Sequence, residues 1–112
     1  MAITSAICNS FKVQILTGTH DFTASTGDTF NLALYTSSAT LNKSTTVYIT
    51  TNEVATATGY TAKGKALTSV TPVLSSDTAV CDFANVSWTS ASFTARGCLI
   101  FNDSVATDPA VC

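Results

Sequence analysis

The side chains that could do chemistry in this chain are few, and the single histidine comes first. His20 stands beside Asp21, and a nucleophilic triad needs a serine or cysteine, a histidine and a carboxylate brought together. No nucleophile-elbow motif surrounds this histidine. A solvated or capping role just after a helix therefore fits His20 better than catalysis. A small hydrolytic or glycan-binding domain stays open as a remote alternative.

The seven carboxylates point to ordinary turns rather than to an active site. Glycosidic chemistry needs a pair of them, but most lie in turn-rich segments where aspartate is favoured for its turn geometry. Asp82 is the exception, because it lies within an expected strand, and we expect it to face outward and discourage edge pairing. Asn102-Asp103-Ser104 followed by Asp108 lacks the alternating oxygen ligands of a calcium loop. We therefore expect no enzyme, metal or cofactor.

The four cysteines are too widely spaced for a Cys-x-x-Cys pair that binds zinc or exchanges disulfides. Two disulfides would allow three connectivities. The N-terminal segment lacks the basic and apolar regions of a secretory signal, so we expect folding in a cytoplasm. Reduced, buried thiols are the expectation for all four: Cys8, Cys81, Cys98 and Cys112.

Composition excludes several classes of partner. The chain has 112 residues, enough for one domain over 1–112, and 46% of them are hydrophobic. Only 11% are charged, against about 25% in an average soluble domain. Five basic residues cannot form a stripe that neutralises phosphates, and no apolar run approaches the roughly 20 residues that span a bilayer. We expect neither nucleic acid nor membrane as a partner.

One segment has helical spacing. Ile7, Phe11 and Ile15 recur every four residues, which predicts a helix over about 5–17. Thr4 or Ser5 would cap its start, and Gly18 suits the left-handed residue that follows a helix.

The rest of the chain favours short strands. Alternating or β-branched residues predict strands at 29–35, 45–50, 66–74, 78–83, 86–89 and 92–101, with 45–50 equally compatible with an extended loop. A shift of apolar parity predicts a bulge at 84–85, and Gly97 a kink. The pattern of residues 57–65 predicts a turn or a protruding loop in which Tyr60 is exposed or at an interface, whereas most other aromatic residues fill the core. The expected fold is mainly β: a single antiparallel β-sandwich, jelly-roll or immunoglobulin-like, with one N-terminal helix.

Several phrases, taken together and in order, resemble a family of small structural proteins encoded by tailed bacteriophages. The resemblance covers nearly the whole chain and implies a virion component with no enzymatic residues to carry over. Members of that family continue past a segment like 108–112 with a further strand or two, so we expect an open sheet edge here that a neighbouring subunit completes. The phrases are Ala6 to Lys12, Gly18 to Phe22, Phe30 to Thr36, Asn52 to Ala62, Asp82 to Trp88 and Leu99 to Asp103.

The resemblance implies a capsid decoration or cement protein, assembled in the host bacterial cytoplasm and present in the virion. A tail, neck or fibre component is the alternative. The expected partners are the major capsid protein or tail proteins, together with further copies of this chain. A near-neutral surface lets copies pack without like-charge repulsion. The candidate interface residues are Lys12, Tyr60, Lys63, Lys65, Val111 and Cys112.

Overall fold

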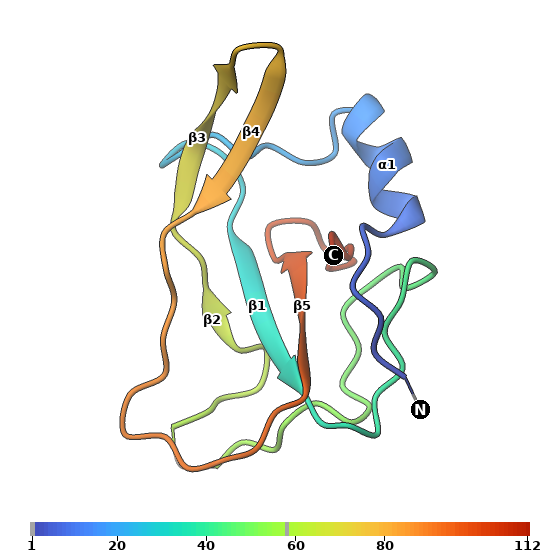
Figure 1. Cartoon of the computed structure of the whole chain (residues 1–112), viewed down its shortest axis with the longest axis vertical. Coiled ribbons are helices and arrows are strands. Elements are labelled where there is room, and N and C mark those ends of the chain that lie inside the picture. The colour runs from blue at the N-terminus through green and yellow to red at the C-terminus, as the bar shows by residue number, and fades with distance from the viewer. Residues whose placement is uncertain (1, 58) are drawn as a thin grey trace.

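The computed structural model describes residues 2–57 and 59–112, and it is mainly β. Met1 and Thr58, which the expected 1–112 domain includes, lie outside the described residues. Two antiparallel sheets form, one in the order β2-β1-β5 and one a β3-β4 hairpin (Figure 1). The expectation of a mainly β chain with an N-terminal helix is confirmed. The elements are α1 (Asn9–Leu16), β1 (Phe30–Tyr35), β2 (Lys65–Ala66), β3 (Ser69–Ser75), β4 (Thr78–Phe83) and β5 (Gly97–Asn102).

Strand β1 is central and covered on both faces. It pairs with β5 over its whole length, from Phe30 opposite Asn102 to Tyr35 opposite Gly97, and with the short β2 on its other edge. Phe30, Ala33 and Tyr35 are fully buried. Because both faces are packed, the simple in–out alternation expected for this strand does not hold.

The C-terminal segment closes the sheet edge beyond β5. Val111 donates its backbone N–H to Ile100 at 2.8 Å, and Asn102 donates to Pro109 at 2.9 Å. On its other side this segment bonds to 46–48, with Ala110 donating to Thr46 at 2.9 Å. The expected open edge at the C-terminal segment is therefore wrong, because residues 109–111 are paired on both sides. Segment 45–50 is the extended loop of the two alternatives, with an isolated bridge at Val47.

The helix is shorter than the sequence predicts. It begins after Cys8, since the backbone from 3 to 8 is extended and bonded elsewhere: Thr4 donates to Leu41 at 2.9 Å and Cys8 to Val111 at 2.9 Å. A cap at Thr4 or Ser5 is therefore wrong. Of the apolar stripe only Phe11 is buried, while 53% of Ile7 is exposed. Gly18 follows the helix with φ +76°, as expected.

Several strand predictions need correction. The expected strand 66–74 is divided between β2 and β3, which lie in different sheets. Residues 86–89 and 92–96 form no strand, so Gly97 is the first residue of β5 rather than a kink within it. The register shift lies on β3 between Val70 and Val73, beside Pro72, and not at 84–85. Proline cannot donate to a ladder, which is why this strand bulges where it does.

Aromatic stacking joins the two sheets. Phe22 stacks on Phe30 of β1 with ring centroids 4.3 Å apart, and Phe83 of β4 lies 5.7 Å from Phe30. The turn end of the β3-β4 hairpin projects past the larger sheet, across from α1 (Figure 1). From Val70 to Asp82 its residues are exposed. We call residues 69–83 the hairpin arm.

Candidate functional site

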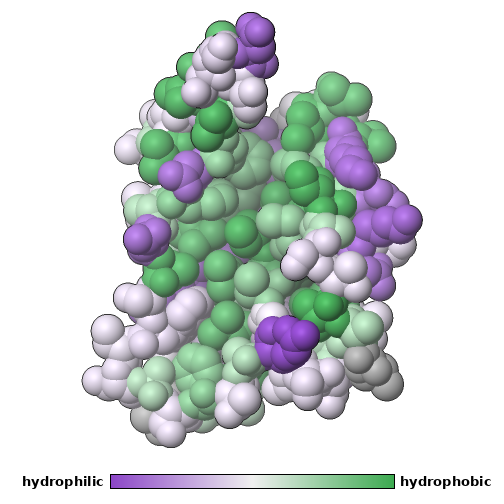
Figure 2. All heavy atoms as spheres, viewed as in Figure 1, coloured by the Kyte–Doolittle hydropathy of each residue, from purple (hydrophilic) through white to green (hydrophobic). Residues whose placement is uncertain are grey.

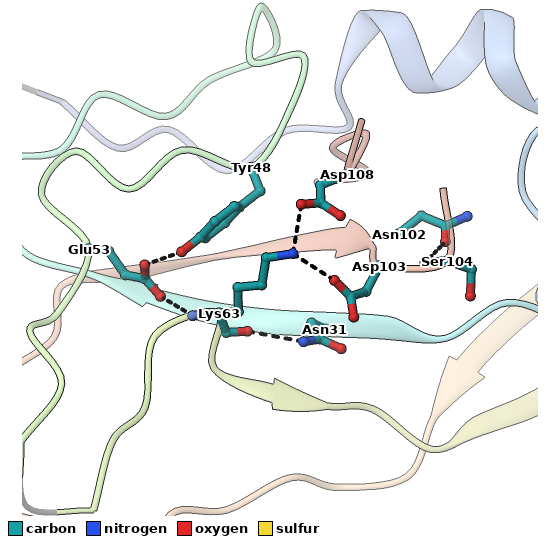
Figure 3. Close-up of polar contacts among 8 residues, drawn as sticks. All are labelled: Asn31, Tyr48, Glu53, Lys63, Asn102, Asp103, Ser104 and Asp108. Carbon is teal, nitrogen blue, oxygen red and sulfur yellow. Dashed lines mark hydrogen bonds and ion pairs between the residues drawn. The ribbon is translucent and has the colours of Figure 1, made fainter. Parts of the chain in front are cut away.

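The carboxylate of Glu53 is the centre of a polar network (Figure 3). It accepts hydrogen bonds from the hydroxyl groups of Tyr48 and Tyr60, the latter at 2.6 Å, and from the backbone N–H of Lys63 at 2.7 Å. The Tyr60 hydroxyl in turn accepts the N–H of Leu34 in β1 at 3.0 Å. These four contacts, the Glu53 network, fix the loops 48–53 and 60–63 against the central strand.

The side chain of Lys63 continues the network toward the C-terminal segment. Its ammonium lies 3.0 Å from Asp103 and 2.8 Å from Asp108, and 5.6 Å from the centre of the Tyr48 ring. Hydrogen bonds from the two carboxylates raise the pKa of Lys63. Since 42% of the Lys63 side chain is exposed, its two ion pairs orient the loop 60–63 more than they stabilise the fold. The arrangement is a clamp in which every charged group already has a partner.

His20 is held as a neutral ring. Asn102, which is fully buried, donates from Nδ2 to Nδ1 of His20 at 3.0 Å, so Nε2 carries the proton and donates to Gln14 at 2.8 Å. The amide of Asn102 cannot turn over, because its Oδ1 accepts the N–H of Ser104 and its Nδ2 also donates to Asp28. Both ring nitrogens therefore have hydrogen-bond partners within the chain.

Acidification is expected to destabilise the fold through His20. Burial lowers the pKa of His20, outweighing the opposite effect of the Asp28 carboxylate. His20 in the unfolded chain therefore becomes protonated near pH 6.5, whereas in the folded chain it stays neutral to lower pH. Because the unfolded state binds the proton more readily, the free energy of unfolding falls as pH drops below that value. Urea unfolding at pH values from about 7.5 to about 5, on either side of the pKa of a free histidine, measures how the free energy of unfolding changes with pH. The His20→Gln variant should flatten this dependence; an equal slope in both proteins would contradict the assignment.

All three tyrosines should resist ionisation in the folded protein. Burial raises the pKa of Tyr48 to about 12 and raises the pKa values of Tyr35 and Tyr60 as well, with Glu53 adding to each. Absorbance at the phenolate band should stay flat through pH 10, the ordinary tyrosine value, and rise only as the chain unfolds. Because the folded pKa values are raised, this stability is present below about pH 10 and is lost above it. Reversible titration of a folded chain near pH 10 would contradict this.

The cysteines are free, as expected, but three of the four are exposed rather than buried. Only Cys8 is buried, whereas Cys81, Cys98 and Cys112 reach the surface. Cys8, Cys98 and Cys112 line one cavity of about 290 Å³ beside Arg96. Partial burial raises the pKa of each thiol, which keeps it protonated and weakly nucleophilic. Within 2–57 and 59–112, no group of three His, Cys, Asp or Glu side chains could hold a metal.

The six predicted interface residues do not form one exposed surface, although Tyr60 and Lys63 meet at the Glu53 carboxylate. Tyr60 is only 2% exposed, so the prediction of an exposed tyrosine is wrong: Glu53 and the β1 backbone hold its hydroxyl inside. Val111 is 7% exposed, because β5 pairs with it. Lys12 is exposed beside Asn9, Lys65 lies over Trp88 with its ammonium bonded to the Ser87 carbonyl, and Cys112 is exposed.

Sequence reasoning missed Glu53 as the centre of a network. A lone glutamate next to a valine carries no signal of its own. Its partners come from loops up to ten residues away, and those of Lys63 from 40 and 45 residues away. The resemblance to the phage family includes residues 52–54 and 59–62, and this is the sequence signal that could point to Glu53 and Tyr60.

The largest unexplained surface is apolar. Figure 2 shows hydrophobic residues over the hairpin arm, over α1 and across the face between them. On the arm, Leu74 is 73% and Val73 60% exposed, and on the helix Leu16 is 86% exposed. Exposed apolar side chains are therefore concentrated on these two elements. The exposed large residues are Ile7, Val13, Ile15, Leu16, Val70, Val73, Leu74 and Val80.

Comparisons with family models, with curated proteins and with solved structures found no match to this chain. In the described part of the chain, no helix is long and apolar enough to cross a membrane, since α1 has only 8 residues.

Proposed function

We propose that this chain is a structural subunit of a tailed-phage virion, in the first place a capsid decoration or cement protein. The observation that carries the proposal is the hairpin arm. A two-stranded hairpin is marginal on its own in water, yet this one exposes Val70, Val73 and Leu74 on β3 and Val80 on β4. Contact with the shell and with further copies of the chain buries that apolar area and stabilises both partners.

A non-enzymatic role is supported by how the chemically capable groups are used. The half-buried charged and titratable side chains Glu53, Lys63 and His20 all have partners within the chain. Tyrosine and cysteine pKa values are raised, away from the values that nucleophiles or bases need near neutral pH. The hydrolytic alternative has no observation in its favour.

We propose further that the assembled unit is a β-sandwich. The β2-β1-β5 sheet and the hairpin arm already meet through Phe22, Phe30 and Phe83. Strands added to the arm would extend the second sheet. The order in which those strands join the sheet would decide between a jelly-roll and an immunoglobulin-like sandwich.

The location of the chain in purified particles tests the function. Gold-labelled antibodies, or a particle reconstruction into which the structure is fitted, should place many copies on the capsid surface. Particles lacking the chain should release DNA at lower temperature or lower salt than complete particles. Labelling confined to the tail would replace the decoration role by the tail alternative, and absence from particles would overturn the virion proposal.

A further inference from the structure

The outer edge of β4 is an unpaired strand edge whose polarity can be worked out. Ala84 donates its N–H to Thr68 at 2.9 Å, next to the pair Ser69 and Phe83, so even-numbered residues of β4 point their backbone groups toward β3. The register shift adds its extra residue to β3 and leaves this alternation intact. Ala79, Cys81 and Phe83 therefore point their N–H and C=O groups outward.

In the described part of the chain, β4 pairs with β3 and with no other strand. It carries no lysine, proline or bulge, which are the usual protections of an exposed edge. Asp82 is its one charge, and this carboxylate accepts the N–H of Phe83 at 2.8 Å. One end of the edge is thus capped from within, while Ala79 and Cys81 stay open to a partner strand.

These features favour the register centred on Val80 over those centred on Cys81 and Asp82. Antiparallel pairing centred on Asp82 would set two carboxylates opposite each other, which is unfavourable. Pairing centred on Cys81 would need the N–H of Phe83, which Asp82 already holds. Pairing centred on Val80 uses the open groups of Ala79 and Cys81, and it sets Asp82 opposite the partner's Thr78.

The same register aligns the apolar side chains. Val73 lies opposite Val80 across the hairpin, on one face, and they are 60% and 39% exposed. Pairing about Val80 places these two valines beside the partner's Val80 and the partner's Val73, in one row across four strands. Rows of β-branched side chains are the stabilising unit of a sheet.

We propose that β4 is the homodimer edge of this protein: a second copy pairs antiparallel with it about Val80 and makes a four-stranded β3-β4-β4-β3 sheet. This inference extends the proposed assembly role by naming the surface and the partner. The partner is a second copy because the edge can pair with itself without setting like charges directly opposite each other, and because its hydrogen-bonding groups and apolar side chains match those of a second β4.

Sedimentation of the purified chain tests the dimer. Wild type should shift from monomer to dimer with rising concentration. Val80→Lys, which sets two ammonium groups opposite each other, should remain monomeric over the same range. Leu16→Lys introduces the same charge on α1 and should dimerise like wild type. A monomeric wild type, or equal dimerisation by the two variants, overturns the proposal. Circular dichroism checks that each variant is folded.

A disulfide cross-link tests the register. The Ala79→Cys substitution places a new thiol opposite the partner's Cys81, in a pair with the Cα separation of about 5.5 Å that disulfides tolerate. Diamide accepts two electrons and two protons from these thiols, so a covalent dimer should form that reductant dissolves. The same substitution combined with Cys81→Ser should not cross-link. A Cys81–Cys81 dimer in the unsubstituted chain would overturn this register.

These measurements fail independently of the virion experiment. Self-association concerns the purified chain alone, whereas labelling concerns its place in a particle. A dimer that is absent from virions would keep the β4 edge and remove the proposed function. A virion protein that stays monomeric in solution would do the reverse.

Discussion

The Gly64→Ala variant is expected to unfold the chain or to lower its free energy of unfolding by more than about 4 kcal/mol, the range of severe backbone and packing defects. Gly64 has φ +70°, and a Cβ there would lie 1.8 Å from the carbonyl oxygen of Leu32 and 2.9 Å from the Cα of Ala33. Both atoms belong to β1, which is paired on both edges and cannot move aside. Chemical denaturation followed by circular dichroism measures the loss.

Gly18→Ala is the matched control for that loss. Gly18 has a similar φ of +76°, but a Cβ there would meet no atom within 4 Å. Only the left-handed conformation is penalised, at about 1 kcal/mol. Equal losses of stability in the two variants would show that the left-handed conformation requires glycine at position 64. The close approach of Gly64 to β1 would then not be the reason.

The Glu53→Gln variant is expected to lose about 3 kcal/mol of stability, as when charge-assisted hydrogen bonds are broken inside a fold. Two hydroxyl groups and one backbone N–H converge on the carboxylate. A glutamine offers one acceptor atom and turns an NH₂ donor toward the remaining donors. Tyr60, only 2% exposed, cannot exchange its lost partner for water. Thermal and urea unfolding would both report the loss.

The control for charge removal is Asp77→Asn, in the exposed turn between β3 and β4. It removes the same charge from a solvated position and should leave stability nearly unchanged. A second readout separates a local from a global effect: Glu53→Gln should lower the pKa of Tyr48, because the carboxylate contributes to raising it. Unchanged stability and an unchanged tyrosine titration would contradict the role given to Glu53.

The local pattern of the sequence determined the class of the fold and several of its elements. Alternation and β-branched residues between turn formers predicted β1, β4 and the second half of the expected 92–101 strand, because these preferences act between neighbours along one chain segment. Gly18 was read correctly as the end of a helix for the same reason. The low charge, and the lack of a sequence motif for metal binding or nucleophilic catalysis, also follow from the sequence alone.

Tertiary structure alone decided where the helix starts, which edges are closed and what the polar side chains do. The backbone donors of Thr4 and Cys8 are taken by distant segments, which moves the helix start to Asn9 against its apolar spacing. Tyr60 lies inside because Glu53 and β1 meet its hydroxyl, although its glycine-rich surroundings resemble an exposed loop. Such contacts join residues far apart in sequence, and periodicity carries no information about them.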